Sequence, residues 1–319
     1  MDLDPKLFSP EAIDADTRRA NETLEKLLAQ TPAIHTQTPQ AIRAAREAGQ
    51  GMWGPIVRLP HADTRAISGP AGELPLRVLR PRSVPVRGVY LHIHGGGHVL
   101  GSHDAQDVAL DQLAERTGAV CVSVGYRLAP EHPYPAGPDD CEAAALWLVE
   151  NARREFGSER LAIGGESAGA HLTAVTLIRL RDRHALTPFR AANLVYGIYD
   201  LGFTPSVRGW GERNLVLSTT IIEWFSNHFI PDRAKRGTTD ASPLYADLRR
   251  LPPALFSVGT LDPLLDDTLF MSARWLAAGN RAELAIYPGG VHGFNGFPTP
   301  LGARANERAR AFVASALAE

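Results

Sequence analysis

The stretch Gly165-Glu166-Ser167-Ala168-Gly169 stands between a short apolar run and a longer run with helical spacing. Gly-x-Ser-x-Gly at a strand-to-helix turn is typical of a nucleophile elbow, in which the serine takes a strained backbone conformation. Side chains at Gly165 or Gly169 would collide across this turn. The turn would lift the Ser167 hydroxyl clear of a sheet and place it at a helix N-terminus, which stabilises developing negative charge.

The elements on either side of this turn alternate between strands and helices. The sequence indicates strands near Ile56 and over residues 64–68, 74–79, 88–93, 119–124, 161–163, 192–196, 254–258 and 282–287. From the fourth of these strands onward, helical stretches follow over residues 105–116, 138–150, 168–180, 264–278 and 302–318. This alternation predicts an α/β fold with a largely parallel sheet covered on both faces. We expect the first two or three strands to form an antiparallel edge.

Two segments outside this alternation are candidates for a lid. In residues 1–50, Ser9-Pro10 and Thr38-Pro39 are each a helix start signal. Between Asp200 and Ser242 no strand is expected, and an apolar helical face includes Trp224 and Phe225. We interpret both segments as parts of one cap, with a purely structural role as the alternative for each.

The composition excludes several classes of protein. A chain of 319 residues with 44% hydrophobic and 21% charged residues is typical of a soluble globular protein. The net charge of −2 gives no reason to expect a nucleic acid or an anionic membrane as partner. No apolar stretch approaches the roughly 18 residues of a membrane helix, and the first residues do not resemble a signal peptide. We therefore expect a cytoplasmic protein without membrane insertion.

Some reactive or charged residues receive a structural interpretation. Cys121 lies inside an apolar run and is predicted to be buried, and with Cys141 it makes no disulfide framework. Arg179, Arg181 and Arg183 are interpreted as a solvated helix end favoured by the helix dipole.

A serine nucleophile needs a base, and the base works best when a carboxylate orients it. In this architecture the partners follow the serine in the order Asp or Glu and then His, each just after a strand. Asp262 and His292 both meet this condition, and no other histidine lies downstream of Asp262. We expect both beside Ser167, whereas Asp266 and Asp267 are interpreted as helix-surface or capping acids.

The run His94-Gly95-Gly96-Gly97 ends the strand over residues 88–93 and can supply backbone N–H donors to an oxyanion. We expect Gly96, Gly97 and Ala168 to be the donors. His94 and Gly95, like Gly165 and Gly169, are interpreted as structural support of the site.

A metal site at His92, His94 and His98 is the competing interpretation of the same region. His92 and His94 share one strand face, and no acid lies between them and His98. We therefore predict no metal there.

Taken together, the motifs resemble the hormone-sensitive-lipase family of α/β-hydrolases, the bacterial esterases with a His-Gly-Gly-Gly motif. The matching stretches are residues 94–97, 126–131 (Tyr-Arg-Leu-Ala-Pro-Glu), 165–169, 262–266 (Asp-Pro-Leu-Leu-Asp) and 292–294 (His-Gly-Phe). Three departures stand out: His98 where an aromatic residue is usual, Glu166 where Asp is commoner, and Ala170-His171 in place of a pair containing Gly.

The resemblance implies an α/β-hydrolase fold with a mostly parallel eight-stranded sheet, flanking helices and a helical cap. The catalytic domain would span residues 51–319, with the cap made of residues 1–50 and an insertion at about 201–240. It also implies a triad of Ser167, Asp262 and His292, and hydrolysis of short- to medium-chain esters without metal or organic cofactor. A homodimer built on the last strand and its neighbouring helices is a further suggestion of the resemblance.

Two other functions stay open at this point. An amidase or deacylase would use the same residues, and the distinction lies in the cap and pocket. A non-catalytic binding protein is the second alternative, since the family resembles a plant hormone receptor that lacks the catalytic histidine. The presence of His292 favours the enzyme.

Overall fold

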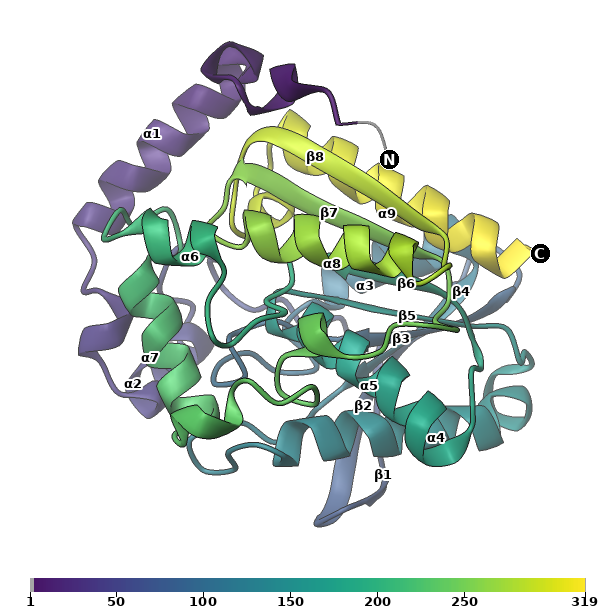
Figure 1. Cartoon of the computed structure of the whole chain (residues 1–319). Helices are drawn as coiled ribbons and strands as arrows, with labels where there is room; N and C mark the ends of the chain where they lie inside the picture. The colour runs from purple at the N-terminus through teal and green to yellow at the C-terminus, as the bar shows by residue number, and fades with distance from the viewer. Residues whose placement is uncertain (1–2, 319) are drawn as a thin grey trace.

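The computed structural model describes residues 3–318 of the chain. Its strands form one eight-stranded sheet in the order β1-β2-β4-β3-β5-β6-β7-β8 (Figure 1). The strands are β1 (Asp63–Gly69), β2 (Gly72–Leu79), β3 (Gly88–Ile93), β4 (Ala119–Val124), β5 (Leu161–Glu166), β6 (Phe189–Val195), β7 (Ala254–Leu261) and β8 (Ala282–Val291). β2 pairs antiparallel with β1 and β4, and the pairings from β4 to β8 are parallel. The predicted α/β fold, its eight-stranded sheet and its antiparallel edge are confirmed.

The strand predicted near Ile56 is wrong. Residues 54–59 form neither strand nor helix. The Leu59 N–H donates to Asp107 Oδ2 at 2.8 Å, and the Leu59 carbonyl accepts from Arg77 at 3.1 Å. At Leu59, side chains and not a neighbouring strand therefore bond the backbone N–H and carbonyl.

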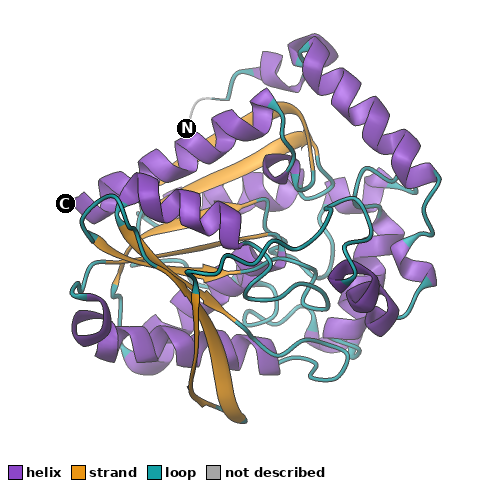
Figure 2. Ribbon diagram, turned by 180° about the vertical axis from the view of Figure 1, so that it is seen from behind, coloured by secondary structure: helices purple, strands orange, loops and turns teal. Residues whose placement is uncertain are grey.

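Helices cover both faces of the sheet. One face carries α4 (Ala136–Phe156), α5 (Ala168–His184) and α8 (Leu265–Ala277), and the other carries α3 (Asp107–Thr117) and α9 (Pro300–Ala318) (Figure 1). Figure 2 shows this second face, with the long helix that ends at the C-terminus lying along it. Every residue of β3 and β4 is buried, because water reaches neither face of these central strands.

Four more helices gather on one side of the molecule, at the left of Figure 1. They are α1 (Ala15–Ala29), α2 (Pro39–Glu47), α6 (Pro205–Trp210) and α7 (Thr219–Phe229). The first two lie in residues 1–50 and the last two in the segment between β6 and β7, where no strand was expected and none is present within residues 200–242. None of the helices of residues 3–318 is both long and apolar enough to cross a membrane.

The two predicted helix starts have different outcomes. Thr38 caps α2 as expected, since its side chain accepts from the Ala41 N–H at 3.2 Å. Ser9, in contrast, precedes only a short 3₁₀ helix, Pro10–Ala12. The helix start signal at Ser9-Pro10 therefore does not begin α1, because Asp14 caps α1 and accepts from the Thr17 N–H at 2.8 Å.

The interpretation of the arginine cluster as a solvated helix end is wrong for two of its three members. Arg179 and Arg181 expose only 3% and 5% of their surface. Arg179 donates to Asp240 at 2.6 and 2.7 Å and to Asp139 at 2.8 Å. The last turns of α5 are therefore enclosed, because acids from distant segments neutralise the guanidinium.

Asp267 is predicted to be a helix-surface or capping acid, and the surface alternative is wrong. It is fully buried and accepts from the Tyr199 and Asp200 N–H groups at 2.6 and 2.9 Å and from Thr204 Oγ1 at 2.6 Å. The carboxylate thus fixes the segment after β6 against α8. Its neighbour Asp266 accepts from the Ser206 N–H at 2.8 Å, at the start of α6.

We expect Arg179→Ala to lower the free energy of unfolding by about 3 kcal/mol, because it leaves carboxylates in a buried network without their cation. Arg183→Ala is the matched control: Arg183 contacts Glu142 and Asp240 of the same network but is 47% exposed, and exposed pairs contribute roughly 0–1 kcal/mol. Urea denaturation of both variants measures the difference. Equal losses in the two would contradict the role given to Arg179.

Candidate active site

The turn between β5 and α5 holds Ser167 in a strained conformation, with φ 57° and ψ −119°. A Cβ at Gly165 would lie 2.1 Å, and one at Gly169 1.9 Å, from the carbonyl oxygen of Ile93. The Gly165 Cβ would also lie 2.7 Å from the Gly169 backbone, which is the collision across the turn that the sequence indicated. Side chains at both positions are therefore excluded mainly by the Ile93 carbonyl at the end of β3, and less by the contact between Gly165 and Gly169 across the turn.

The structure brings Ser167, His292 and Asp262 together. Asp262 directly follows β7 and His292 directly follows β8. Asp262 Oδ2 lies 2.9 Å from His292 Nδ1, and His292 Nε2 lies 2.9 Å from Ser167 Oγ. A carboxylate only accepts, so Nδ1–H donates to Asp262, which leaves Nε2 of a neutral ring to accept the Ser167 hydroxyl proton.

The carboxylate of Asp262 is held in place from its other side. Its side chain has no exposed surface, and Oδ1 accepts from the Leu264 N–H at 2.9 Å. A fixed carboxylate holds the imidazole in one orientation and tautomer.

The loop after β3 faces the serine with free backbone donors. Gly96 and Gly97 have φ of +116° and +62°, and among the backbone hydrogen bonds of residues 3–318 neither N–H donates to a carbonyl. Ala168 is the first residue of α5, where N–H groups have no partner within the helix. None of the three predicted oxyanion donors is therefore used in a backbone hydrogen bond of residues 3–318.

Residues 90–296 match the protein family described as alpha/beta hydrolase fold. The chain belongs to this α/β-hydrolase family. Carboxylic ester hydrolase LipN from Mycobacterium tuberculosis is 36% identical over 253 residues, which are 77% of this chain and 67% of LipN. Ethyl acetate hydrolase from Pseudomonas putida is 33% identical over 227 residues, 69% of this chain and 71% of the relative. The structure of a hyperthermophilic esterase from the archaeon Pyrobaculum calidifontis has a TM-score of 0.84 and 30% identity and covers 99% of both chains.

These relatives confirm the resemblance to the hormone-sensitive-lipase family that the motifs indicated. Within this α/β-hydrolase, His94 lies beneath the donor loop. Its Nδ1–H donates to the Gly95 carbonyl at 2.8 Å, and its ring stacks on Tyr126, whose hydroxyl donates to the His94 carbonyl at 2.9 Å. Burial lowers the pKa of His94 to about 3, so the ring is neutral. Such a ring supports the loop but does not exchange protons near neutral pH.

The three histidines of the competing metal interpretation have separate partners. His92 Nδ1 lies 2.9 Å from Ser123 Oγ, and its Nε2 lies 3.2 Å from Glu166. His98 Nε2 lies 3.0 Å from His171 Nδ1. Within residues 3–318 no group of three or more His, Cys, Asp or Glu is arranged to hold a metal ion.

The pair of His98 and His171 joins two of the departures from the family pattern. His171 Nε2–H donates to the Ala241 carbonyl at 2.8 Å. Burial lowers the pKa of both histidines, that of His171 to about 4, so His171 Nδ1 carries no proton and accepts from His98 Nε2–H. The His98 ring also stacks on Phe229 of α7, with centroids 3.7 Å apart.

The sequence did not point to Tyr196 as part of the site. It follows β6, and its ring packs on that of His292 with centroids 4.7 Å apart. Its hydroxyl donates to Asn295. The only signal was its place just after a strand at the edge that carries Ser167, Asp262 and His292.

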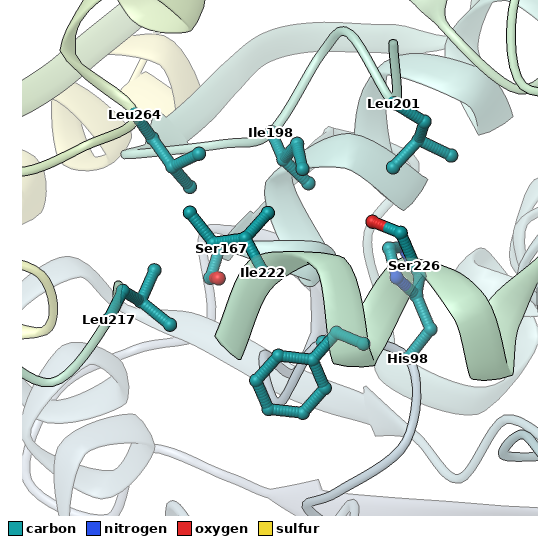
Figure 3. Close-up of a pocket in the computed structure, with 10 residues that line it drawn as sticks. His98, Ser167, Ile198, Leu201, Leu217, Ile222, Ser226 and Leu264 are labelled. Carbon is teal, nitrogen blue, oxygen red and sulfur yellow. The ribbon is translucent and has the colours of Figure 1, made fainter. Parts of the chain in front are cut away.

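Two cavities meet at Ser167. Five of the ten residues that line the smaller cavity, of about 30 Å³, are aliphatic (Figure 3). These are Ile198, Leu201, Leu217, Ile222 and Leu264. It has room for only a few non-hydrogen atoms. The larger, of about 700 Å³, contains Ser167 and His292 and runs between α3 and α9. Leu217 and Phe225 line both cavities, and Trp53 lines the larger one.

We expect a fluorophosphonate to label Ser167, because its hydroxyl lies 2.9 Å from His292 Nε2 and Ser167 lines both cavities. Ser123 Oγ also lies 2.9 Å from a histidine nitrogen, His92 Nδ1, but Ser123 is fully buried and should not be labelled. His292→Ala should slow labelling about 10⁴-fold or more. His184→Ala, which removes an exposed histidine whose Nε2 lies 2.8 Å from Glu142, is the control and should label at the normal rate. Intact-protein mass spectrometry follows the reaction, and labelling of the Ser167→Ala variant would contradict the assignment.

Proposed function

We propose that this α/β-hydrolase is a serine carboxylesterase that hydrolyses short- to medium-chain carboxylic esters through an acyl-enzyme. The observation that carries the proposal is the chain of two 2.9 Å hydrogen bonds from Asp262 through His292 to Ser167, next to free backbone donors. The relatives named carboxylic ester hydrolase and ethyl acetate hydrolase support the same reaction.

In the proposed mechanism His292 takes the Ser167 proton as Oγ attacks the ester carbonyl. Asp262 stabilises the imidazolium that forms. The N–H groups of Gly96, Gly97 and Ala168 bind the oxyanion, and the N-terminus of α5 adds a favourable dipole. His292 then protonates the leaving alcohol, and water repeats these steps on the acyl-enzyme.

The two cavities differ in volume, which supports binding of the acyl group in one and of the alcohol part in the other. We assign the acyl group to the cavity of about 30 Å³ and the alcohol to the one of about 700 Å³. A small apolar pocket beside the nucleophile favours acyl groups of two to four carbons or so, because a longer chain displaces Leu201, Ile222 or Leu264.

We further propose that residues 1–50 and about 201–240 form the cap of the site. Two contacts support this. Arg43 of α2 donates to the Val99 carbonyl at 2.8 Å and to the Ala129 carbonyl at 2.6 Å, next to the donor loop. Phe225 of α7 lies so close to Gly97 that a Cβ there would be 2.2 Å from its ring.

A cytoplasmic location and a homodimer built on β8 also remain proposals. β8 is an edge strand of the sheet. Asn21 of α1 donates to the Gly289 carbonyl of this strand at 2.8 Å, so the N-terminal segment already covers part of that edge.

The first test is hydrolysis of p-nitrophenyl esters from acetate to palmitate. We expect the highest kcat/KM at acetate to butyrate and a fall of at least about tenfold by octanoate, because the acyl cavity is small. Ser167→Ala should abolish hydrolysis. No hydrolysis of any ester by the folded protein would contradict the proposal and favour an amidase or a binding protein.

Gly97→Ala tests the donor loop. A methyl group at φ +62° and against Phe225 must displace the N–H groups, and the loss of one oxyanion donor costs about 10²–10³ in kcat. Gly157→Ala is the matched control, because Gly157 has φ +77° and nothing within 4 Å of its added Cβ. The control should keep full esterase activity. A similar loss of activity in both variants would mean that backbone strain alone is responsible.

A further inference from the structure

Arg46 differs from the other enclosed arginines of the structure. It lies in α2 and lines the large cavity that contains Ser167 and His292. Its side chain is half-buried, and its Nε is fully buried without a hydrogen-bond partner. Every other arginine of residues 3–318 that is not exposed donates to a carboxylate, a carbonyl or a side-chain amide.

The charge of Arg46 is not used to hold α2 in place. Arg43, one turn earlier, does this through Val99, Ala129 and Glu131. Burial lowers the pKa of Arg46, whereas a neighbouring carboxylate would raise it. The Nε–H of Arg46 is removed from water without a partner, which costs free energy, so the fold itself gains nothing from this charge.

The other charged groups of this cavity are already matched. Glu166 lies 3.2 Å from His92 Nε2 and accepts from Gln106 at 3.2 Å. Arg310 donates to Gln112 at 2.6 Å, and its charge is paired with Glu307 at 3.8 Å. The positive charge of Arg46 is therefore the one left for a ligand among the described residues that line this cavity.

The apolar residues Met52, Trp53 and Val57 line the same cavity. Trp53 and Val57 are exposed, and a ligand that covers them excludes water and strengthens the attraction between a guanidinium and an anion. A guanidinium also matches the planar geometry of a carboxylate with two parallel hydrogen bonds.

We propose that the large cavity selects esters whose alcohol part carries a carboxylate, and that Arg46 binds this carboxylate. The inference rests on the proposed esterase function. The small cavity, of about 30 Å³, has no room for a charged acyl group, so the carboxylate belongs to the alcohol part. Arg46 is then a specificity-determining residue and takes no part in the proton transfers.

The test compares 4-acetoxybenzoate with 4-acetoxybenzamide, in which a neutral amide replaces the carboxylate. In Arg46→Met the ratio of their kcat/KM values should fall about 10- to 100-fold, the range for a charge-assisted hydrogen bond, mainly through KM. Arg46→Lys should keep part of the preference. In the control Arg58→Met the ratio should stay within about twofold, because Glu47 and Asp104 already neutralise Arg58.

Two further readouts separate the possible failures. Arg46→Met should keep or raise the midpoint of thermal unfolding, because it removes an unpaired cation, and a clear fall would overturn the inference. An unchanged ratio with the neutral ester still hydrolysed would also overturn it, while the esterase function would stand. Arg46→Met can be compared in the same way on p-nitrophenyl hemisuccinate and p-nitrophenyl butyrate, in which the carboxylate belongs to the acyl group. A fall of this ratio of kcat/KM values, with the ratio for the benzoate pair unchanged, would refute the placement of the carboxylate on the alcohol part. No Ser167-dependent hydrolysis of any of these esters would refute the esterase function itself.

Discussion

The site depends on backbone packing so close that no side chain fits between the end of β3 and the elbow. The Ile93 carbonyl occupies the space that a Cβ at Gly165 or Gly169 would need. A Cβ at Gly95 would likewise lie 2.7 Å from the Glu166 carbonyl. This close packing holds the loop of residues 95–97 next to Ser167. The strained Ser167 and the free N–H groups of the loop therefore face the same position. Parallel pairing of β5 through β8 then brings the residues that follow β7 and β8 to the same edge.

The site residues that could be predicted from the sequence are those that directly follow a strand. Asp262, His292 and the glycine loop each come directly after a strand, and parallel strands end at a common edge. The fold class followed from the same alternation. The burial of Arg179 and Asp267 could not be predicted, because their partners lie about 60 residues away in the chain and local spacing carries no information on distant pairing. Arg46 was missed for a related reason: the absence of a partner is visible only in three dimensions.

Two departures from the family pattern have one physical explanation. His98 replaces an aromatic residue and still stacks on Phe229 as an aromatic ring would. Its additional N–H needs an acceptor in a buried place, and His171 supplies it. In the sequence these residues lie far apart and look like independent changes. In the structure His98 Nε2–H and His171 Nδ1 would each lack a hydrogen-bond partner without the other residue. The Ala241 carbonyl accepts the remaining N–H of His171.

The unequal cavities also constrain the order of events after the acyl-enzyme forms. If the acyl group occupies the small cavity as proposed, that cavity, with room for only a few non-hydrogen atoms, cannot hold the hydrolytic water as well. Water must therefore reach the acyl carbon through the space that the alcohol has just left. Alcohol departure and water entry share one passage, so an alcohol that lingers there competes directly with water for the same carbon. The fraction of the acyl-enzyme that is hydrolysed, and not converted back to the ester, is thus set by how quickly water replaces the alcohol in that passage.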